Sequence, residues 1–208
     1  MKTRTYILTI LAATVLLGLT SCSPIILGLY GMKNSKKVDE KVILRYSKKY
    51  NIPLVDGYEL DTSYISFLSS LDTTLYKSQR ENHYQPLQAL YYDKTGQLQS
   101  FQINCYAGGF PNLHWDRNGI FTTFPPEQQA PIDSIMQFDT QLKFLRVLSQ
   151  TKKFSADNYD YIVIVYWSRF MGRQSKRLIR FVQDNSKLTT DKKVKIIYAN
   201  TDNIFARQ

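Results

Sequence analysis

Hydrophobic and polar positions follow the clearest pattern in the last quarter of the chain. Residues 159–167 form a nearly continuous run of β-branched and aromatic side chains, which is typical of a central strand buried on both faces. Apolar residues recur at helical spacing over 173–185, and a second apolar run covers 193–198. This order of strand, helix and strand predicts a βαβ unit with two parallel strands and a right-handed crossover.

The first part of the folded region shows weaker helical patterns. Residues 38–50 carry apolar side chains at helical spacing, and Pro53 prevents that helix from continuing. A second, weaker helix is predicted over 63–71. The stretch 73–85 is polar and without periodicity, so a loop is expected there.

The middle of the chain predicts a β-hairpin and one more helix. Strands are expected over 87–92 and 98–105, joined by a turn in which Gly96 supplies positive φ. Apolar residues at 134–148 share one helical face, which predicts a helix. Together these elements indicate an α/β fold.

The N-terminal residues 1–21 have the features of an export signal. Their first residues include the basic Lys2 and Arg4, and an uncharged apolar run follows over 6–19, which is too short for a membrane-spanning helix of about 20 residues. The sequence Leu-Thr-Ser-Cys that ends at Cys22 resembles a bacterial lipobox. This resemblance implies that Cys22 is acylated and becomes the mature N-terminus; the alternative is an ordinary signal peptide that contains a cysteine.

The residues after Cys22 bear on location and domain organisation. Ser23 is not the aspartate that retains proteobacterial lipoproteins in the inner membrane, and no acidic surface-export signal follows. We therefore expect a lipid anchor in the outer membrane, facing the periplasm. Residues 22–37 would form a lipidated tether, and 38–208 a single domain.

Composition and charge exclude several classes of protein. Hydrophobic residues at 43% and charged residues at 21% are normal for a globular domain and exclude a disordered or polytopic membrane chain. His83 and His114 lie far apart, without nearby thiols or carboxylate pairs, so we expect loop or surface histidines and no metal site. The net charge of +10 would suit nucleic acid, but an exported protein does not meet that partner. Anionic lipid or glycan is the expected alternative.

The run 161–178 resembles the signature of thioredoxin-like proteins, in which an apolar strand ends in Phe-Trp-Ala-x-Trp and Cys-Gly-x-Cys opens a helix. When Trp167 and Gly172 are aligned with that signature, Met171 and Gln174 occupy the two cysteine positions. Dithiol exchange needs an ionisable attacking thiol and a resolving thiol, and neither residue supplies one. The resemblance therefore implies a redox-inactive domain without a cofactor.

The specific resemblance covers 159–202, and the pattern is also similar to Bacteroidetes lipoproteins with a cysteine-free thioredoxin-like end. It implies a thioredoxin-like three-layer sandwich with an N-terminal helical and β-hairpin elaboration. The chain ends too soon for the family's terminal hairpin, so the hairpin at 87–105 is expected to complete the sheet.

Four basic residues at spacings of 4, 3 and 4 would form one helical stripe if the helix began early enough. They are Arg169, Arg173, Lys176 and Arg180. Positive charge at a helix N-terminus opposes the helix dipole, so these residues are candidates for binding an anionic lipid, glycan or acidic envelope protein. The alternative is a solvated face of a basic protein.

Aromatic residues punctuated by glycine and proline occupy the middle segment. Tyr106, Trp115, Phe121 and Phe124 could line a groove for a peptide or sugar, although packing over the sheet is the plainer interpretation.

Two functional hypotheses remain. The first is a non-enzymatic envelope lipoprotein that uses its domain as a binding or assembly module. The second is a thiol-disulfide-related enzyme with residual chemistry at Cys105, which is the one thiol left after acylation of Cys22.

Overall fold

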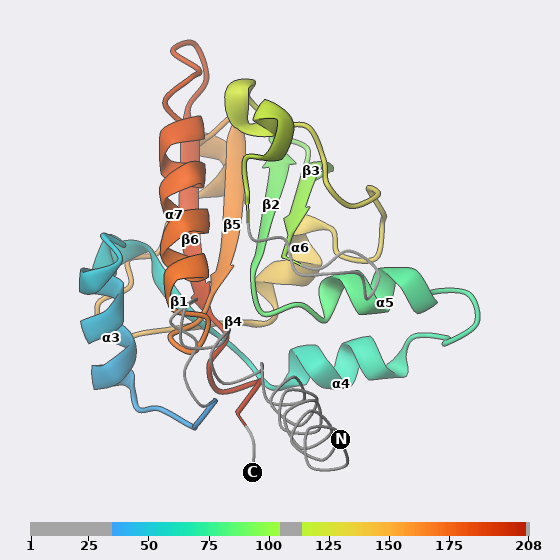
Figure 1. The fold of residues 1–208 in the computed structure, drawn as a ribbon, viewed down its shortest axis with the longest axis vertical. Helices are drawn as coiled ribbons and strands as arrows, with labels where there is room; N and C mark the ends of the chain where they lie inside the picture. The colour runs from blue at the N-terminus through green and yellow to red at the C-terminus, as the bar shows by residue number, and fades with distance from the viewer. Residues whose placement is uncertain (1–34, 105–113, 207–208) are drawn as a thin grey trace, which may run out of the picture.

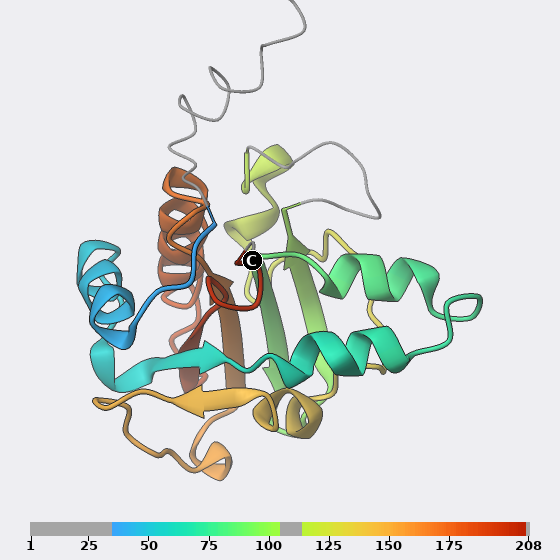
Figure 2. The same cartoon turned by 90° about the horizontal axis from the view of Figure 1, so that it is seen from below.

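The computed structural model describes residues 35–104 and 114–206. Its centre is a six-stranded mixed β-sheet with strand order β3-β2-β5-β6-β1-β4. Helices cover both faces of this sheet (Figures 1 and 2). The chain therefore has the mixed α/β architecture that the sequence predicts.

The core of the sheet is the βαβ unit formed by β5 (Tyr161–Trp167), α7 (Arg173–Asn185) and β6 (Val194–Asn200). β5 and β6 pair in parallel over their full length, from the pair Tyr161 and Val194 onward. The residues of β5 after Tyr161 are buried, as the continuous apolar run requires. This unit confirms the prediction made from periodicity.

The hairpin of β2 (Gln88–Asp93) and β3 (Leu98–Ile103) lies on the other side of β5. β2 pairs antiparallel with both β3 and β5. Gly96 has φ of +79° in the connecting turn, and its backbone N–H donates to the carbonyl of Asp93 at 2.9 Å. The hairpin thus completes the sheet beside β5, as expected.

The opposite edge of the sheet differs from the prediction. β1 (Gly57–Leu60), which the sequence did not reveal, pairs parallel with β6, and β4 (Leu145–Val147) pairs antiparallel with β1. The predicted helix over 134–148 is therefore wrong, since only α6 (Phe138–Leu142) is helical there. Pairing with the free edge of β1 gives residues 145–147 backbone hydrogen bonds to a neighbouring strand. This stabilisation is greater than the local preference of these residues for a helix.

Three further helices complete the two outer layers. They are α3 (Glu40–Lys49), α4 (Ser63–Ser70) and α5 (Lys77–His83). The loop predicted over 73–85 is wrong, because α5 forms within it. The inward side chains of α5 include Asn82 and His83, so its buried face is polar and gives no hydrophobic signal.

Short 3-10 turns link the main elements at η1 (Leu54–Asp56), η3 (Arg117–Thr122) and η4 (Ala156–Asn158). Within the described ranges, no helix has the length and apolar character needed to cross a membrane.

Two hydrophobic cores lie on opposite faces of the sheet. Alternate residues of β5 divide between them: Ile164 and Tyr166 face the core that includes α4 and α6, whereas Val165 and Trp167 face the core under α3 and α7. This alternation places the end of β5, and the loop after it, against the helices α3 and α7.

Candidate functional site

The loop between β5 and α7 contains the positions that the thioredoxin resemblance singles out. Trp167 is the last residue of β5, and its ring contacts Tyr50 edge-on at 5.7 Å. Met171 is buried in the core beneath α7, and Gln174 is buried in the first turn of that helix. Gly172 precedes the helix with φ of +49°. The four positions therefore lie together at one strand-to-helix junction.

The chemistry available at this junction is limited. The Met171 thioether does not ionise, and Gln174 contains no sulfur. Both side chains are buried. The Gln174 side-chain amide forms no hydrogen bond within the described part of the chain. This junction has no nucleophile at either motif position, so dithiol exchange cannot take place there.

Two serines hold the loop in shape. The Ser175 hydroxyl donates to the Ser168 carbonyl at 2.6 Å, and the Ser168 backbone N–H donates to Ser175 Oγ at 3.1 Å. The Met171 N–H donates to the Ser168 hydroxyl at 3.2 Å. These bonds tie the end of β5 to the first turn of α7 and satisfy backbone groups that would otherwise be buried without partners.

Asp202, just after β6, is the buried charge of this region. Its carboxylate accepts hydrogen bonds from the backbone N–H groups of Arg169 at 2.8 Å and Phe170 at 3.3 Å, and from the Asn200 amide at 2.8 Å. Burial is the largest influence on this group and raises the pKa of Asp202, although these bonds oppose the shift. Because its oxygens are already occupied, Asp202 anchors the loop and is not a free general base.

The predicted four-residue stripe divides in the structure. Arg173, Lys176 and Arg180 are exposed on α7, as expected. Arg169 is not part of the stripe, because α7 begins only at Arg173 and the condition of an early helix start is not met. Its side chain is 14% exposed, and its Nε lies 3.9 Å from the Asp202 carboxylate.

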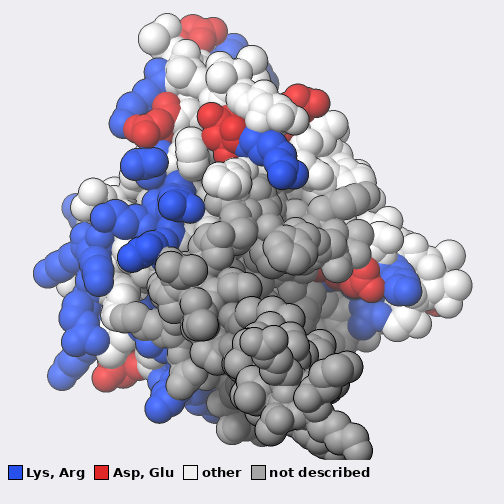
Figure 3. Space-filling view, in the orientation of Figure 1, with Lys and Arg blue, Asp and Glu red and all other residues white. Residues whose placement is uncertain are grey.

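Helix α3 supplies further cations on the same side of the molecule. Both helices pack on one face of the sheet, and the Gln183 side chain of α7 donates to the Asn51 carbonyl just after α3 at 2.9 Å. Figure 3 shows Lys and Arg gathered over these two helices. We define the basic face as the exposed cations of both helices: Lys41, Arg45, Lys48, Lys49, Arg173, Lys176, Arg177 and Arg180.

Several charges of the basic face are not neutralised by an ion pair among the described residues. In the part of the chain that the structure describes, Lys41, Lys48, Lys176 and Arg180 take part in no ion pair within 4.0 Å. A concentration of like charge on one exposed face lowers stability and creates a positive potential, which attracts anionic partners.

The histidines have different surroundings from each other. His83 is fully buried, stacks on Phe101 at 4.6 Å, and places Nε2 3.1 Å from the Asp133 carboxylate. The expectation of a surface or loop position is therefore wrong for His83, whereas His114 is exposed in a loop. Across the described ranges, no group of three or more His, Cys, Asp or Glu side chains could hold a metal ion.

The aromatic residues of the middle segment belong mainly to the core. Trp115 is fully buried, and its indole N–H donates to the Gln174 carbonyl at 3.3 Å. Phe121 stacks on Phe181 of α7, and Phe124 contacts Tyr161 edge-on at 5.0 Å. These contacts confirm the interpretation as core packing for the three residues.

Cys22, Cys105 and Tyr106 lie outside the described residues.

Comparison with known protein families, characterised proteins and solved structures finds no match to this chain.

Proposed function

We propose that this protein is a lipoprotein of the bacterial cell envelope, anchored through Cys22 in the outer membrane and facing the periplasm. Its redox-inactive thioredoxin-like domain serves as a binding or assembly module. The export signal and the lipobox-like sequence support the anchor. Acyl chains contribute about 0.8 kcal/mol per buried CH₂, so a multiply acylated N-terminus holds a protein durably at a membrane.

The order of the strands supports the finer description of the fold. In thioredoxin-like proteins, a parallel βαβ pair is flanked by an antiparallel hairpin beside the strand that carries the redox motif. Here β5 and β6 form the parallel pair, and the β2–β3 hairpin lies beside β5. This hairpin comes from an earlier part of the chain, so the chain needs no C-terminal hairpin to complete the same arrangement.

The basic face is the observation that carries the proposed binding role. Eight exposed cations gather over α3 and α7, next to a loop that contains no thiol. In an exported protein, this charge suits anionic lipid, phosphorylated glycan or an acidic envelope protein. We propose that the basic face contacts such a partner while the lipid anchor limits the search to the membrane surface.

An envelope enzyme with residual thiol chemistry at Cys105 is the second candidate. The sequence favours it only in that Cys105 is the single thiol of the mature chain. Met171 and Gln174 argue against a dithiol mechanism, because a lone cysteine would have to find its resolving thiol in another molecule.

Fractionation tests the anchor. The Cys22→Ser protein should move from the membrane fraction to the soluble or unprocessed fraction and lose the added mass of the acyl chains. Unchanged membrane association and mass would contradict the lipoprotein proposal.

Vesicle binding tests the basic face, with the mature chain 22–208 produced without its lipid. Arg173→Glu/Arg180→Glu should lower binding to anionic phosphatidylglycerol vesicles about tenfold or more, and salt should weaken wild-type binding because the Debye length is about 8 Å at physiological ionic strength. The matched control is Lys152→Glu/Lys153→Glu, which makes the same change in net charge at two exposed positions outside the basic face.

Comparison of the two double variants shows whether vesicle binding depends on the basic face itself or only on the net charge of the protein. Binding should survive in the control pair, and the melting temperature should change little in either. Equal losses of binding in both double variants would mean that net charge alone attracts the vesicle. Unchanged binding in Arg173→Glu/Arg180→Glu would mean that the basic face is an ordinary solvated surface.

A further inference from the structure

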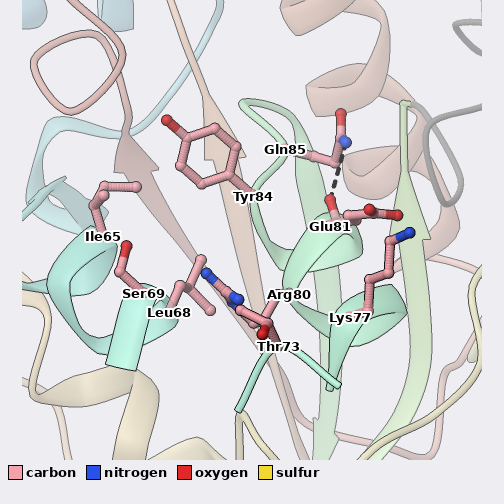
Figure 4. Close-up of a pocket in the computed structure, with 9 residues that line it drawn as sticks. All are labelled: Ile65, Leu68, Ser69, Thr73, Lys77, Arg80, Glu81, Tyr84 and Gln85. Carbon is pink, nitrogen blue, oxygen red and sulfur yellow. Dashed lines mark hydrogen bonds between the residues drawn. The ribbon is translucent and has the colours of Figure 1, made fainter. Parts of the chain in front are cut away.

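A cavity lined by described residues lies away from the basic face, between α4 and α5. The two helices lie side by side on the opposite face of the sheet (Figures 1 and 2), and the space between them has a volume of about 730 Å³. Ile65, Leu68 and Ser69 line it from α4, and Arg80 and Tyr84 from the α5 side (Figure 4). This volume falls within the range of about 300–1,000 Å³ that is typical of small-molecule sites.

The α4 side of the cavity is mainly apolar. Leu68 is almost fully buried, and Ile65 is partly buried and packs against the same core. Tyr84, which is 49% exposed, presents its ring from the opposite side. These three side chains would shield an alkyl chain or another apolar group from water.

The charge in the cavity comes from α5. Figure 4 shows the Arg80 guanidinium extending from α5 toward Leu68 and Ser69. Its Nε is buried and has no hydrogen-bond partner among the described residues. No carboxylate of these residues lies within 4.0 Å of the Arg80 or Lys77 side-chain nitrogens. Among the described residues of the lining, Glu81 is the one acidic side chain, against these two cations.

A buried guanidinium N–H without an acceptor is uncommon, because a buried donor that leaves water normally finds a partner. An anion bound beside Arg80 would supply the missing acceptor. The planar guanidinium matches a carboxylate in geometry and can form two parallel hydrogen bonds with it. The cavity therefore combines a cation that needs an acceptor with an apolar wall.

We propose that the cavity between α4 and α5 binds a single-chain carboxylate amphiphile, with Arg80 at the carboxylate and Ile65, Leu68 and Tyr84 along the alkyl chain. Lys77 at the outer side adds attraction for the negative head. Leu75 and Tyr76, in the connection between the two helices, are 71% and 38% exposed and provide apolar surface near by. This site depends neither on the lipid anchor nor on the basic face.

Photoaffinity labelling tests the proposal on the purified full chain. The probe is decanoate with a photoreactive diazirine near the end of its alkyl chain, and the matching decanol derivative is its neutral counterpart. The decanoate probe should label peptides within 63–85 saturably, and unlabelled decanoate should compete. The decanol probe should label the same peptides at least several-fold less.

Three variants give the test its specificity. Arg80→Gln should lower labelling by subsaturating decanoate probe about tenfold, since hydrogen bonds to charged groups are the stronger kind. Ser69→Trp, at an exposed position of the lining, should lower labelling by filling the cavity. The control Arg180→Gln removes the same charge from the basic face and should leave labelling unchanged.

Equal labelling by the acid and the alcohol would overturn the role of Arg80, as would labelling that Arg80→Gln does not change. Labels that map outside 63–85, or that persist unchanged in Ser69→Trp, would overturn the site. Far-ultraviolet circular dichroism of each variant establishes that the labelled protein is folded. A negative labelling result would not contradict the proposals for the lipid anchor and the basic face, because neither contributes a residue to this cavity.

Discussion

Replacing the buried Asp202 by alanine tests whether this carboxylate holds the β5–α7 loop in place. The substitution removes the acceptor for the backbone N–H groups of Arg169 and Phe170 and for the Asn200 amide. Hydrogen bonds to a charged group are worth about 1.5–3 kcal/mol each, but the cost of burying the carboxylate offsets part of this gain. We therefore expect Asp202→Ala to lower the free energy of unfolding by about 3 kcal/mol.

The measurement is thermal unfolding followed by circular dichroism. For a chain of this size, a loss of 1 kcal/mol lowers the melting temperature by about 2–4 °C, so Asp202→Ala should lower it by about 6–12 °C. Asp191→Ala is the matched control, because the Asp191 side chain is 75% exposed and its removal should change stability by no more than about 0.5 kcal/mol.

An Asp202→Ala protein that melts within about 2 °C of the wild type would contradict this role of the carboxylate. That result would mean that the two backbone N–H groups find other acceptors, and that the loop is held by the serine contacts alone. An equal loss in Asp191→Ala would point instead to a general effect of charge.

Three other measurements follow from the same structure. Because burial raises the pKa of Asp202, the folded state binds this proton more tightly than the unfolded chain does. The stability of the wild type relative to Asp202→Asn should therefore rise as the pH falls through the folded pKa, and a rise with increasing pH would contradict this. The full chain should not reduce insulin disulfides above a buffer blank, and turnover that disappears in Cys105→Ser would revive the enzyme hypothesis. Leu178→Ala should cost about 2–5 kcal/mol in chemical denaturation and Lys176→Ala less than about 0.5 kcal/mol, whereas similar costs would show that the phase assigned to α7 is wrong.

The sequence alone determined the βαβ unit and the hairpin. The apolar run of β5, the helical spacing of α7 and the glycine turn between β2 and β3 are local signals, and the structure agrees with each of them. The thioredoxin resemblance also came from the sequence alone and stays a prediction: the alignment of Trp167 and Gly172 with that signature places Met171 and Gln174 at its two cysteine positions.

Elements that depend on distant partners could not be predicted in this way. β4 replaces part of the predicted helix because β1, some 85 residues earlier, offers an unpaired edge, and their pairing brings Arg146 to Glu59. Helix α5 was missed because its inward face carries Asn82 and His83, which gain their partners only in the folded chain. A polar side chain with a buried partner looks the same in sequence as one that faces water.

The candidate sites divide in the same way. Exposure of Arg173 and Arg180 follows from the helical phase of α7. Arg169 lies outside the stripe because α7 begins only at Arg173, and its backbone N–H donates instead to Asp202, just after another strand. The basic face joins α3 to α7 across more than 120 residues of chain, and the cavity beside Arg80 exists only because α4 and α5 lie side by side. The periodicity of the sequence predicts which side of its own helix or strand a residue occupies. A site, however, needs several elements in a fixed relative placement. Only the packing of those elements against the shared sheet determines that placement.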